Sequence, residues 1–267
     1  MKIAAFRHNG KKFLGRVEGQ WARPFAGVSD FMDFLRQGCS REESEIPLDE
    51  IEFLPPVENP GKIICVGRNY PEHAAEQGAQ IPDHPIIFSK FASALCGHRG
   101  YILKPPETEK LDFEAELAVV IGKGGKNIKA ESYFEHVAGY MNFNDVSARD
   151  VQAADKQWTR AKSFDTFAPC GPFLVTKDEI DDPHNLHIRS FLNCNPMQDS
   201  RTSLMLFKIP VLIEFISRAI TLEAGDIIAT GTPAGVGVFR DPPVFMQPGD
   251  VIEVEIEGLG RLRNRIR

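Results

Sequence analysis

Residues 112–121, DFEAELAVVI, place two carboxylates directly before a strongly apolar run. The run predicts a buried β-strand, and because side chains alternate along a strand, Glu114 and Glu116 point to the same face, one pleat apart. Two carboxylates this close repel each other unless a cation lies between them, one binds a proton, or both face water. On spacing alone a solvated strand face is the commoner explanation. A metal site therefore needs a further ligand.

Asp145 supplies a third carboxylate. It lies in the polar segment 142–150, NFNDVSARD, which begins as an apparently buried strand over 138–143 ends. Three carboxylates suit a hard cation such as Mg²⁺ or Mn²⁺ and leave octahedral positions open for water or a chelating substrate. The alternative role for Asp145 is that of a helix N-cap. Glu114, Glu116 and Asp145 are thus the candidate metal ligands.

The pattern of the chain predicts a β-rich α+β fold. Strands separated by turns rich in Gly, Pro and Asp are expected over 62–67, 113–121, 138–143, 172–176, 227–230 and 251–256. A short helix is expected over 71–77 and an amphipathic helix over 210–220. Long helices do not alternate regularly with the strands, so a doubly wound α/β sheet is not expected.

The N-terminal residues predict a small β-rich domain of their own. Short alternating segments flank Asn9-Gly10, a dipeptide typical of a tight hairpin turn. The segment 55–61, PPVENPG, resists both helix and central strand. We therefore expect a small N-terminal domain over 1–58 and a main domain over 59–267.

Charge and composition bear on partners and location. The net charge of -6 argues against a general affinity for nucleic acid. No apolar run approaches the roughly 20 residues that cross a bilayer, and the first residues turn polar too early for a signal-peptide core. We expect no membrane association and a cytoplasmic location. The five cysteines include no C-x-x-C pair, which favours reduced thiols.

Five motifs together make the chain resemble the fumarylacetoacetate hydrolase family over roughly residues 60–267. They are VGRNY at 66–70 followed by His73, DFEAE at 112–116, NDVSARD at 144–150, AKSFD at 161–165 and TGTPAGVG at 230–237. Their order and spacing carry the resemblance. It implies a homodimeric enzyme whose main domain is a mixed β-sandwich roll, with the three carboxylates above as metal ligands.

The resemblance also implies catalytic roles for three side chains. His73 is similar to the family's general base, and Glu76 to its partner, which is plausible because residues at i and i+3 share a helix face. Lys162 resembles an active-site lysine whose charge balances that of an enolate.

Four further residues resemble substrate-binding positions. Arg149 and Gln152 look like residues that orient the substrate, and Arg149 can fork onto a carboxylate. Gly231 and Thr232 lie in a segment that contacts the substrate in relatives, where they offer N–H or hydroxyl donors. That segment lacks the G-K-[ST] ending of a phosphate loop, so no nucleotide site is expected.

A departure from the founding hydrolase narrows the expected activity. The resemblance implies that the founding hydrolase has a four-carboxylate site, with an additional Asp near the first motif. At that place this chain has the segment 65–68, CVGR, which contains no acid. The chain is similar instead to three-carboxylate relatives: acylpyruvate hydrolases, oxaloacetate decarboxylases or tautomerases, and hydroxymuconate-type isomerases.

We expect a metal-dependent enzyme that hydrolyses a C–C bond in a small 2-oxo, acylpyruvate-type acid through an enolate that the metal stabilises. Decarboxylation or tautomerisation of oxaloacetate and hydroxymuconate-type isomerisation are the alternatives. A metal-binding protein without turnover is the alternative from another class. It is disfavoured because His73, Lys162 and all three acids stand at their motif positions.

Overall fold

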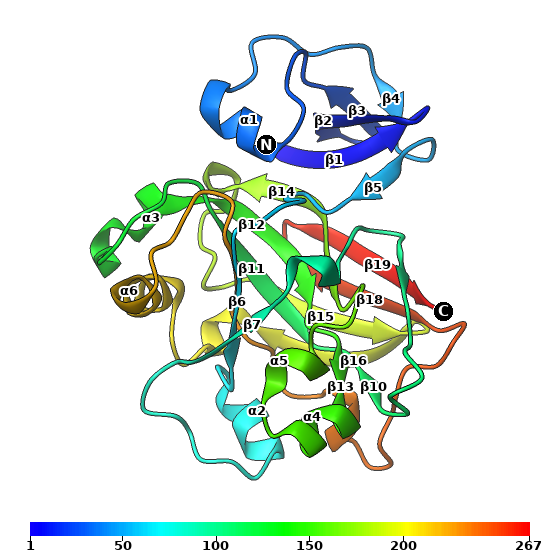
Figure 1. Cartoon of the computed structure of the whole chain (residues 1–267), viewed down its shortest axis with the longest axis vertical. Coiled ribbons are helices and arrows are strands. Elements are labelled where there is room, and N and C mark those ends of the chain that lie inside the picture. Colours follow the sequence, from blue (N-terminus) through cyan, green and yellow to red (C-terminus); the bar gives the residue numbers. More distant parts are fainter.

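The computed structural model, which describes residues 1–267, is built around two large β-sheets, with a separate two-stranded sheet (Figure 1). The strands are β1 Lys2–His8, β2 Lys11–Glu18, β3 Trp21–Pro24, β4 Ile46–Pro47, β5 Glu52–Leu54, β6 Ile63–Gly67, β7 Ile86–Lys90, β8 Leu95–Cys96, β9 Tyr101–Ile102, β10 Leu111–Asp112, β11 Ala115–Ile121, β12 Val137–Asn144, β13 Ser147–Ala148, β14 Ala168–Thr176, β15 His187–Leu192, β16 Asn195–Arg201, β17 Ile227–Ala229, β18 Val251–Ile256 and β19 Gly260–Ile266. The helices are α1 Phe31–Gln37, α2 Pro71–Glu76, α3 Tyr133–His136, α4 Arg149–Asp155, α5 Trp158–Ala161 and α6 Ile209–Ala219.

The larger sheet is mixed and has twelve strands in the order β4-β3-β2-β1-β14-β12-β11-β17-β6-β7, with β5 paired to β1 and β8 paired to β14. The smaller sheet has five strands in the order β16-β15-β18-β19-β9 and packs against β11, β12 and β14 of the larger one. The expected β-rich α+β fold is confirmed.

Five of the six strands predicted in the main domain lie within two residues of their observed bounds, whereas β14 begins four residues earlier than predicted and β7, β8, β9, β10, β13, β15, β16 and β19 were not predicted. Strand β18 has the predicted bounds, and β6 and β17 differ from them by one residue. The strand predicted over 113–121 begins later, at Ala115, because the Glu114 N–H donates to the Asn144 side chain (3.0 Å) instead of to a neighbouring strand. Glu114 therefore lies just before the strand.

Apolar residues on the two sheets and on α6 account for the core of the main domain. Strand β11 is buried along its whole length, as expected for a central strand covered on both faces. Helix α6 buries Leu212, Ile213 and Ile216 in one cluster with Val119 and Val254. This packing makes β11 a rigid support for the carboxylates at its N-terminal end.

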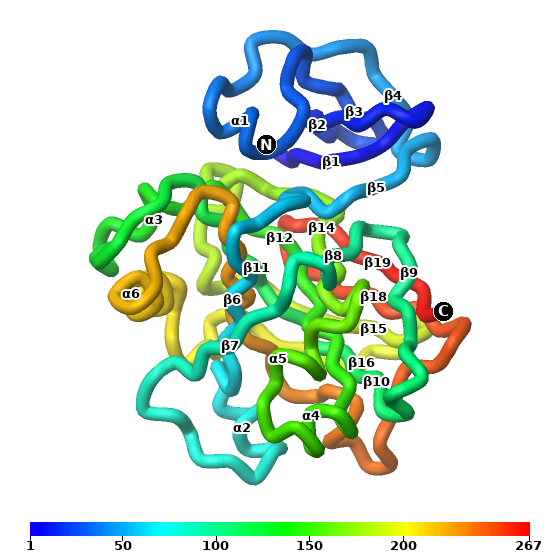
Figure 2. The backbone as a smooth tube through the Cα atoms, viewed as in Figure 1, coloured from blue at the N-terminus to red at the C-terminus, as the bar shows by residue number.

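The N-terminal strands form the upper lobe in Figure 1, and the tube in Figure 2 follows β5 down into β6. The predicted turn at Asn9-Gly10 joins β1 to β2. Lys2 and Ile3 of β1 pair with Val175 and Leu174 of β14, so the large sheet continues from this lobe into the main domain. The lobe also has its own small apolar cluster around Phe6 and Phe53.

His98 lies where the main domain contacts that lobe. Its ring meets the Phe53 ring edge-on at 4.9 Å, and its Nδ1 accepts the Arg263 backbone N–H at 3.1 Å. Burial, with the charges of Arg99 and Arg263, lowers the pKa of His98 to about 4. The imidazole is therefore neutral in the folded protein at pH 5, whereas an unfolded histidine with a pKa of 6.5 is charged.

Stability is therefore expected to fall as the pH drops from about 6.5 to about 4, and this contribution should level off below that range. The loss due to His98 should be about 2 kcal/mol after allowance for its remaining exposure. Urea unfolding at pH 7 and pH 5 measures it. In His98→Asn, which keeps an acceptor but cannot be protonated there, the pH-dependent loss should shrink. An equal loss in both proteins would remove His98 as its source.

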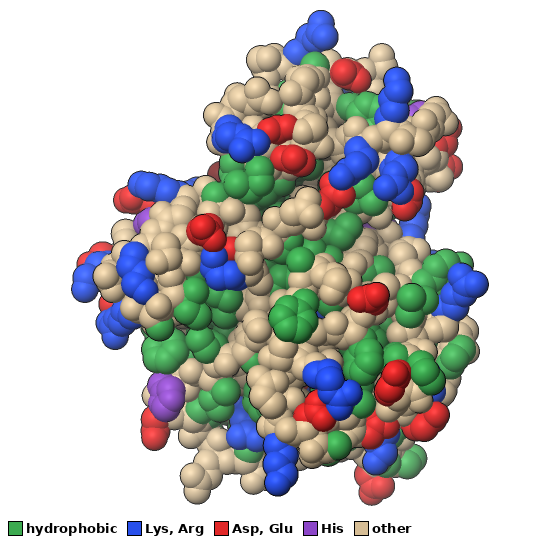
Figure 3. All heavy atoms as spheres, viewed as in Figure 1, with side chains coloured by type: hydrophobic (Ala, Val, Ile, Leu, Met, Phe, Trp, Pro, Cys, Tyr) green, Lys and Arg blue, Asp and Glu red, His purple; other side chains and the backbone are tan.

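The face seen in Figure 3 carries basic and acidic side chains interspersed, without an extended area of one sign. None of the helices combines the length and apolar character needed to cross a bilayer. All five cysteines are free, as the sequence predicted.

Candidate active site

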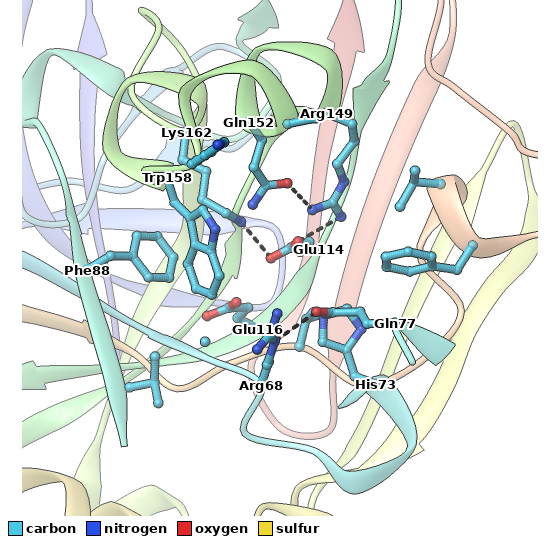
Figure 4. Close-up of a pocket in the computed structure, with 17 residues that line it drawn as sticks. Arg68, His73, Gln77, Phe88, Glu114, Glu116, Arg149, Gln152, Trp158 and Lys162 are labelled. Atoms are coloured by element: carbon cyan, nitrogen blue, oxygen red, sulfur yellow. Dashed lines mark hydrogen bonds and ion pairs between the residues drawn. The ribbon is translucent and has the colours of Figure 1, made fainter. Parts of the chain in front are cut away.

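A cavity of about 400 Å³ opens among α2, α4 and α5 and the end of β6 (Figure 4). Chain segments far apart in sequence meet here because β11, β17 and β6 are neighbours in the large sheet. The side chains that line it include Arg68, His73, Gln77, Phe88, Glu114, Glu116, Arg149, Gln152, Trp158, Lys162, Thr232 and Phe239.

The three candidate ligands meet in this site. One carboxylate oxygen from each of Glu114, Glu116 and Asp145 lies within 4.8 Å of the others, and all three residues are buried. The pairing of Ala115 in β11 with Asn144 in β12 explains the convergence, because Glu114 precedes one partner and Asp145 follows the other. The Asp145 N–H donates to the Glu114 carbonyl (2.9 Å), which joins the two strand ends. Asp145 is therefore no helix N-cap.

Two buried lysines neutralise part of this acidic cluster. The Lys162 Nζ donates to Glu114 Oε2 (2.9 Å), Asp145 Oδ2 (2.7 Å) and Ser147 Oγ (2.8 Å). The Lys90 Nζ donates to Asp145 Oδ1 at 2.6 Å. Burial opposes the charged form of Lys162, but Asp145 and Glu114 outweigh it and raise its pKa. Lys162 thus reaches the acids directly and is not an ordinary surface lysine.

Arg149 holds the other side of the cluster. Its Nε donates to Asp112 Oδ2 at 2.8 Å, and its Nη2 lies 2.7 Å from Glu114 Oε1. Burial disfavours the charge on Glu114, yet Lys162 and Arg149 together lower its pKa to about 2. Glu114 is therefore ionised, with one cation on each carboxylate oxygen.

Glu116 is the carboxylate that lacks a cationic partner. It accepts the Gly231 N–H at 2.9 Å. Burial, then the charges of Asp145 and Glu114, raise its pKa well above the ordinary value. A cation beside Glu116 would reverse this effect.

Charge balance and donor type both fit a divalent ion. Four buried carboxylates face three buried cationic side chains, so the site has an excess of negative charge when Glu116 is ionised: Asp112, Glu114, Glu116 and Asp145 against Lys90, Arg149 and Lys162. The converging oxygens of the three ligand candidates are hard donors, of the kind that Mg²⁺ and Mn²⁺ prefer over soft metals.

His73 and Glu76 form the predicted pair on α2. The His73 Nδ1 lies 2.6 Å from Glu76 Oε1, and the other oxygen of Glu76 accepts the Gly235 N–H at 2.9 Å. On the opposite ring nitrogen, the Gln77 amide nitrogen lies 2.6 Å from His73 Nε2. Because the Gln77 oxygen accepts from Arg68 (3.0 Å), the amide donates to Nε2 and the Nδ1–H donates to Glu76. Nε2 is thus the basic nitrogen.

Of the four expected substrate-binding residues, Arg149, Gln152 and Thr232 line the cavity and Gly231 does not, and all four contact protein groups. Gln152 Oε1 accepts from Arg149 Nη1 at 3.1 Å, as the dashed line in Figure 4 shows. The Gly231 N–H donates to Glu116. Arg149 forms ion pairs with Asp112 and Glu114. The Thr232 hydroxyl accepts from Gln198 at 2.7 Å and borders the cavity.

Sequence reasoning missed several residues that build the site. Lys90 ends the short strand β7, and nothing in that segment of sequence indicates its contact with Asp145. Asp112 was read only as part of a motif, although it accepts from Arg149 and from the backbone of Gly237 (2.8 Å). Gln198 supports both β11 and Thr232 through its side-chain amide.

The fold belongs to the β-rich α+β class, and its cavity leads to a cluster of three buried carboxylates. This combination is typical of an enzyme. The family model described as fumarylacetoacetate (FAA) hydrolase, C-terminal, matches residues 62–267, and one described as Rv2993c-like, N-terminal, matches residues 1–56. The chain belongs to the fumarylacetoacetate hydrolase family.

Named relatives extend this comparison. The oxaloacetate tautomerase FAHD2A, mitochondrial, of Bos taurus is 51% identical over 237 residues, which are 88% of this chain and 76% of that protein. The oxaloacetate tautomerase fahd2, mitochondrial, of Xenopus laevis is 53% identical over 218 residues, 81% of this chain and 68% of that protein. Because those names place the relatives in mitochondria, the cytoplasmic location stays a prediction.

Solved structures agree on the fold. The fumarylacetoacetate hydrolase from Exiguobacterium antarcticum aligns over 100% of this chain and 99% of its own with a TM-score of 0.91 and 36% identity. The 5-carboxymethyl-2-hydroxymuconate delta-isomerase from Mycobacterium smegmatis aligns over 100% and 98% with a TM-score of 0.84 and 35% identity. The family is thus confirmed, whereas hydrolysis, the identity of the metal and the dimer stay predictions.

Proposed function

We propose that this protein is a divalent-metal-dependent enzyme that interconverts the enol and keto forms of a small 2-oxo acid, with oxaloacetate as the leading substrate. The observation that carries the proposal is a cavity lined by His73 together with Glu114 and Glu116 of the acidic cluster. The relatives named as oxaloacetate tautomerases support this reaction over the C–C hydrolysis that the sequence favoured.

Glu114, Glu116 and Asp145 would hold the ion, and Mg²⁺ or Mn²⁺ supplies Lewis-acid polarisation of a 2-oxo group when bound. The reaction moves one proton from the C2 hydroxyl of the enol and adds one proton at C3, so it needs a group that can carry a proton both ways. His73 serves as that group, and Glu76 fixes its tautomer through Nδ1.

Other residues of the cavity stabilise charge and orient the substrate. The Lys162 ammonium offsets negative charge that develops on the C2 oxygen. Thr232 and Gln152 border the cavity and offer a hydroxyl and an amide to substrate oxygens. Phe88, Trp158 and Phe239 add apolar surface to the wall of the cavity.

Hydrolysis of an acylpyruvate is the second candidate. The His73–Glu76 pair favours it, because the same geometry that carries a proton also activates a water molecule. Cleavage would break the C–C bond next to the attacked carbonyl and release a carboxylic acid and an enolpyruvate that takes up a proton. Decarboxylation of oxaloacetate and isomerisation of a hydroxymuconate-type acid would also pass through an enolate. The substrate screen below distinguishes them.

A substrate screen tests the proposal directly. The Mg²⁺-loaded or Mn²⁺-loaded protein is supplied with enol-oxaloacetate, acylpyruvates and a hydroxymuconate-type acid, and the products are followed by ultraviolet absorbance and NMR. Faster ketonisation of oxaloacetate than the metal alone produces, without loss of CO₂, supports tautomerisation. Acylpyruvate cleavage with no effect on oxaloacetate ketonisation would replace it by hydrolysis.

Lys162→Met is expected to lower kcat by about 100-fold, because charge on the substrate oxygen develops in the transition state more than in the bound substrate. The substitution also removes one of the two cations that contact each of Glu114 and Asp145, so the thermal unfolding temperature is recorded with and without Mg²⁺. Steady-state kinetics on the folded variant decide whether Lys162 acts in the transition state or only in substrate binding. A higher KM with unchanged kcat would make Lys162 a uniform binding contact.

We also propose the homodimer that the family resemblance implied. Large apolar side chains that stay exposed in the single chain support it, among them Phe91 (60% exposed) and Tyr101 (49%). Light scattering of the purified protein measures the mass in solution.

A further inference from the structure

Arg68 differs from Arg149 and Lys162, the two buried cations that line the cavity. Arg149 and Lys162 are each paired with buried carboxylates. Arg68 forms no ion pair: its Nε donates to the neutral Gln77 side chain (3.0 Å), and its guanidinium carbon lies 5.9 Å from the centre of the Trp158 ring. Its terminal nitrogens are therefore available to an anion.

The backbone holds Arg68 in place at the cavity. Arg68 follows β6 directly with φ at 54°, a left-handed conformation that costs free energy for any residue other than glycine. Gly67 lets Trp158 approach, since a Cβ on Gly67 would meet that ring at 2.3 Å. The turn, the indole and the guanidinium thus form one packed wall, and the labelled side chains in Figure 4 show Arg68 beside Gln77 on the wall that also carries His73.

The position of Arg68 suits the far end of a short substrate. Strand β17 separates β6, which leads to Arg68, from β11, which carries Glu116. At a strand spacing of about 4.8 Å the two backbones are roughly 10 Å apart. Both side chains line one cavity, so a small molecule bound at the acidic cluster can also contact the guanidinium.

We propose that Arg68 binds the second carboxylate of the substrate, so that the cavity selects 2-oxo dicarboxylates over 2-oxo monocarboxylates. The inference rests on the proposed function for the orientation of the 2-oxo end. A guanidinium supplies two parallel N–H donors to a carboxylate, and the Trp158 face limits its freedom before the substrate arrives. Gln77 occupies Nε and leaves the two terminal nitrogens for this contact.

A matched pair of inert ligands tests the selection without turnover. N-oxalylglycine and N-methyloxamate share a 2-oxo carboxylate end and differ by one carboxylate, and neither can enolise or lose CO₂ as a β-keto acid. Calorimetric titration with saturating Mg²⁺ should show wild type binding the diacid about 10- to 100-fold more tightly, the range of a hydrogen bond to a charged group. Arg68→Met should abolish this difference and leave the affinity for N-methyloxamate within about threefold.

Two variants complete the experiment. Arg68→Lys keeps the charge at the same backbone position but loses the fork, and should retain part of the preference. Lys156→Met removes the exposed cation on the cavity wall and should leave the preference unchanged. Thermal unfolding confirms that each variant is folded.

Three results would overturn the inference. They are equal affinities of wild type for the two ligands, a preference that survives in Arg68→Met, or one that disappears in Lys156→Met. A preference that depends on Arg68, in a protein that does not tautomerise oxaloacetate, would retain the carboxylate receptor and reject only the proposed reaction.

Discussion

Removal of divalent metal with EDTA is expected to abolish turnover, and Mg²⁺ or Mn²⁺ is expected to restore it. Glu116 has no cationic partner and is held at a raised pKa by burial and by Asp145 and Glu114, so a cation in this site relieves a repulsion that the protein does not relieve itself. Lys90 and Lys162 already neutralise Asp145 and Glu114. The metal-free protein should therefore stay folded.

The substitution Glu116→Gln tests whether Glu116 is a ligand of the metal ion. It keeps the side-chain volume and the acceptor for the Gly231 N–H but removes the charge that attracts the ion. Metal affinity is expected to fall by a factor on the order of 10², measured by calorimetric titration with Mn²⁺. Glu135→Gln, at an exposed site without an ion pair, is the control. An unchanged titration for Glu116→Gln, or full activity in verified metal-free protein, would defeat the metal assignment.

The acidic cluster was predictable from sequence because its strongest signal is local. Glu114 and Glu116 stand two residues apart at the start of an apolar strand, and the motif DFEAE at 112–116 favours a metal site over the solvated strand face that the spacing alone would suggest. The hairpin at Asn9-Gly10 was predictable for the same reason, since turn geometry depends on adjacent residues. The family motifs then brought Asp145 and Lys162 to the same centre.

The partners of the cluster were not predictable because they depend on tertiary contacts. Lys90 reaches Asp145 across 55 residues of sequence, and nothing in its own segment indicates a carboxylate neighbour. Arg149 was expected to bind substrate, yet the contact that holds it is Asp112, 37 residues away. Buried ion pairs of this kind are set by which strands become neighbours, and a single sequence does not state that order.

Helix α2 contains one pair that the sequence predicted and other contacts that it did not predict. Pro71 at its start and the spacing of His73 and Glu76 predicted a helix with both side chains on one face, and the structure has them 2.6 Å apart. The same spacing said nothing of Gln77, which covers Nε2, or of Arg68, which orients Gln77. The motif thus predicts the general base His73, whereas Gln77, which contacts its Nε2, is identified only by the structure.

His73→Ala is expected to reduce turnover by a factor on the order of 10² to 10⁴, the usual contribution of a positioned general base. The structure supports this size because His73 lines the cavity and is held through Nδ1 by Glu76, whose second oxygen accepts the Gly235 N–H. Metal affinity should be unchanged, because the histidine is outside the ligand cluster. His84→Ala, an exposed histidine, is the control.

Glu76→Gln should give a milder defect of the same kind, since the amide still fills the space beside Nδ1 but provides no charge to support an imidazolium. The double variant should be no worse than His73→Ala, because Glu76 acts through the imidazole and loses its role once the ring is gone. Rates of oxaloacetate ketonisation and of acylpyruvate cleavage are measured for all three proteins. Equal ketonisation by wild type and His73→Ala would exclude His73 as the proton carrier, and a strictly additive double variant would show that Glu76 acts on the substrate by itself.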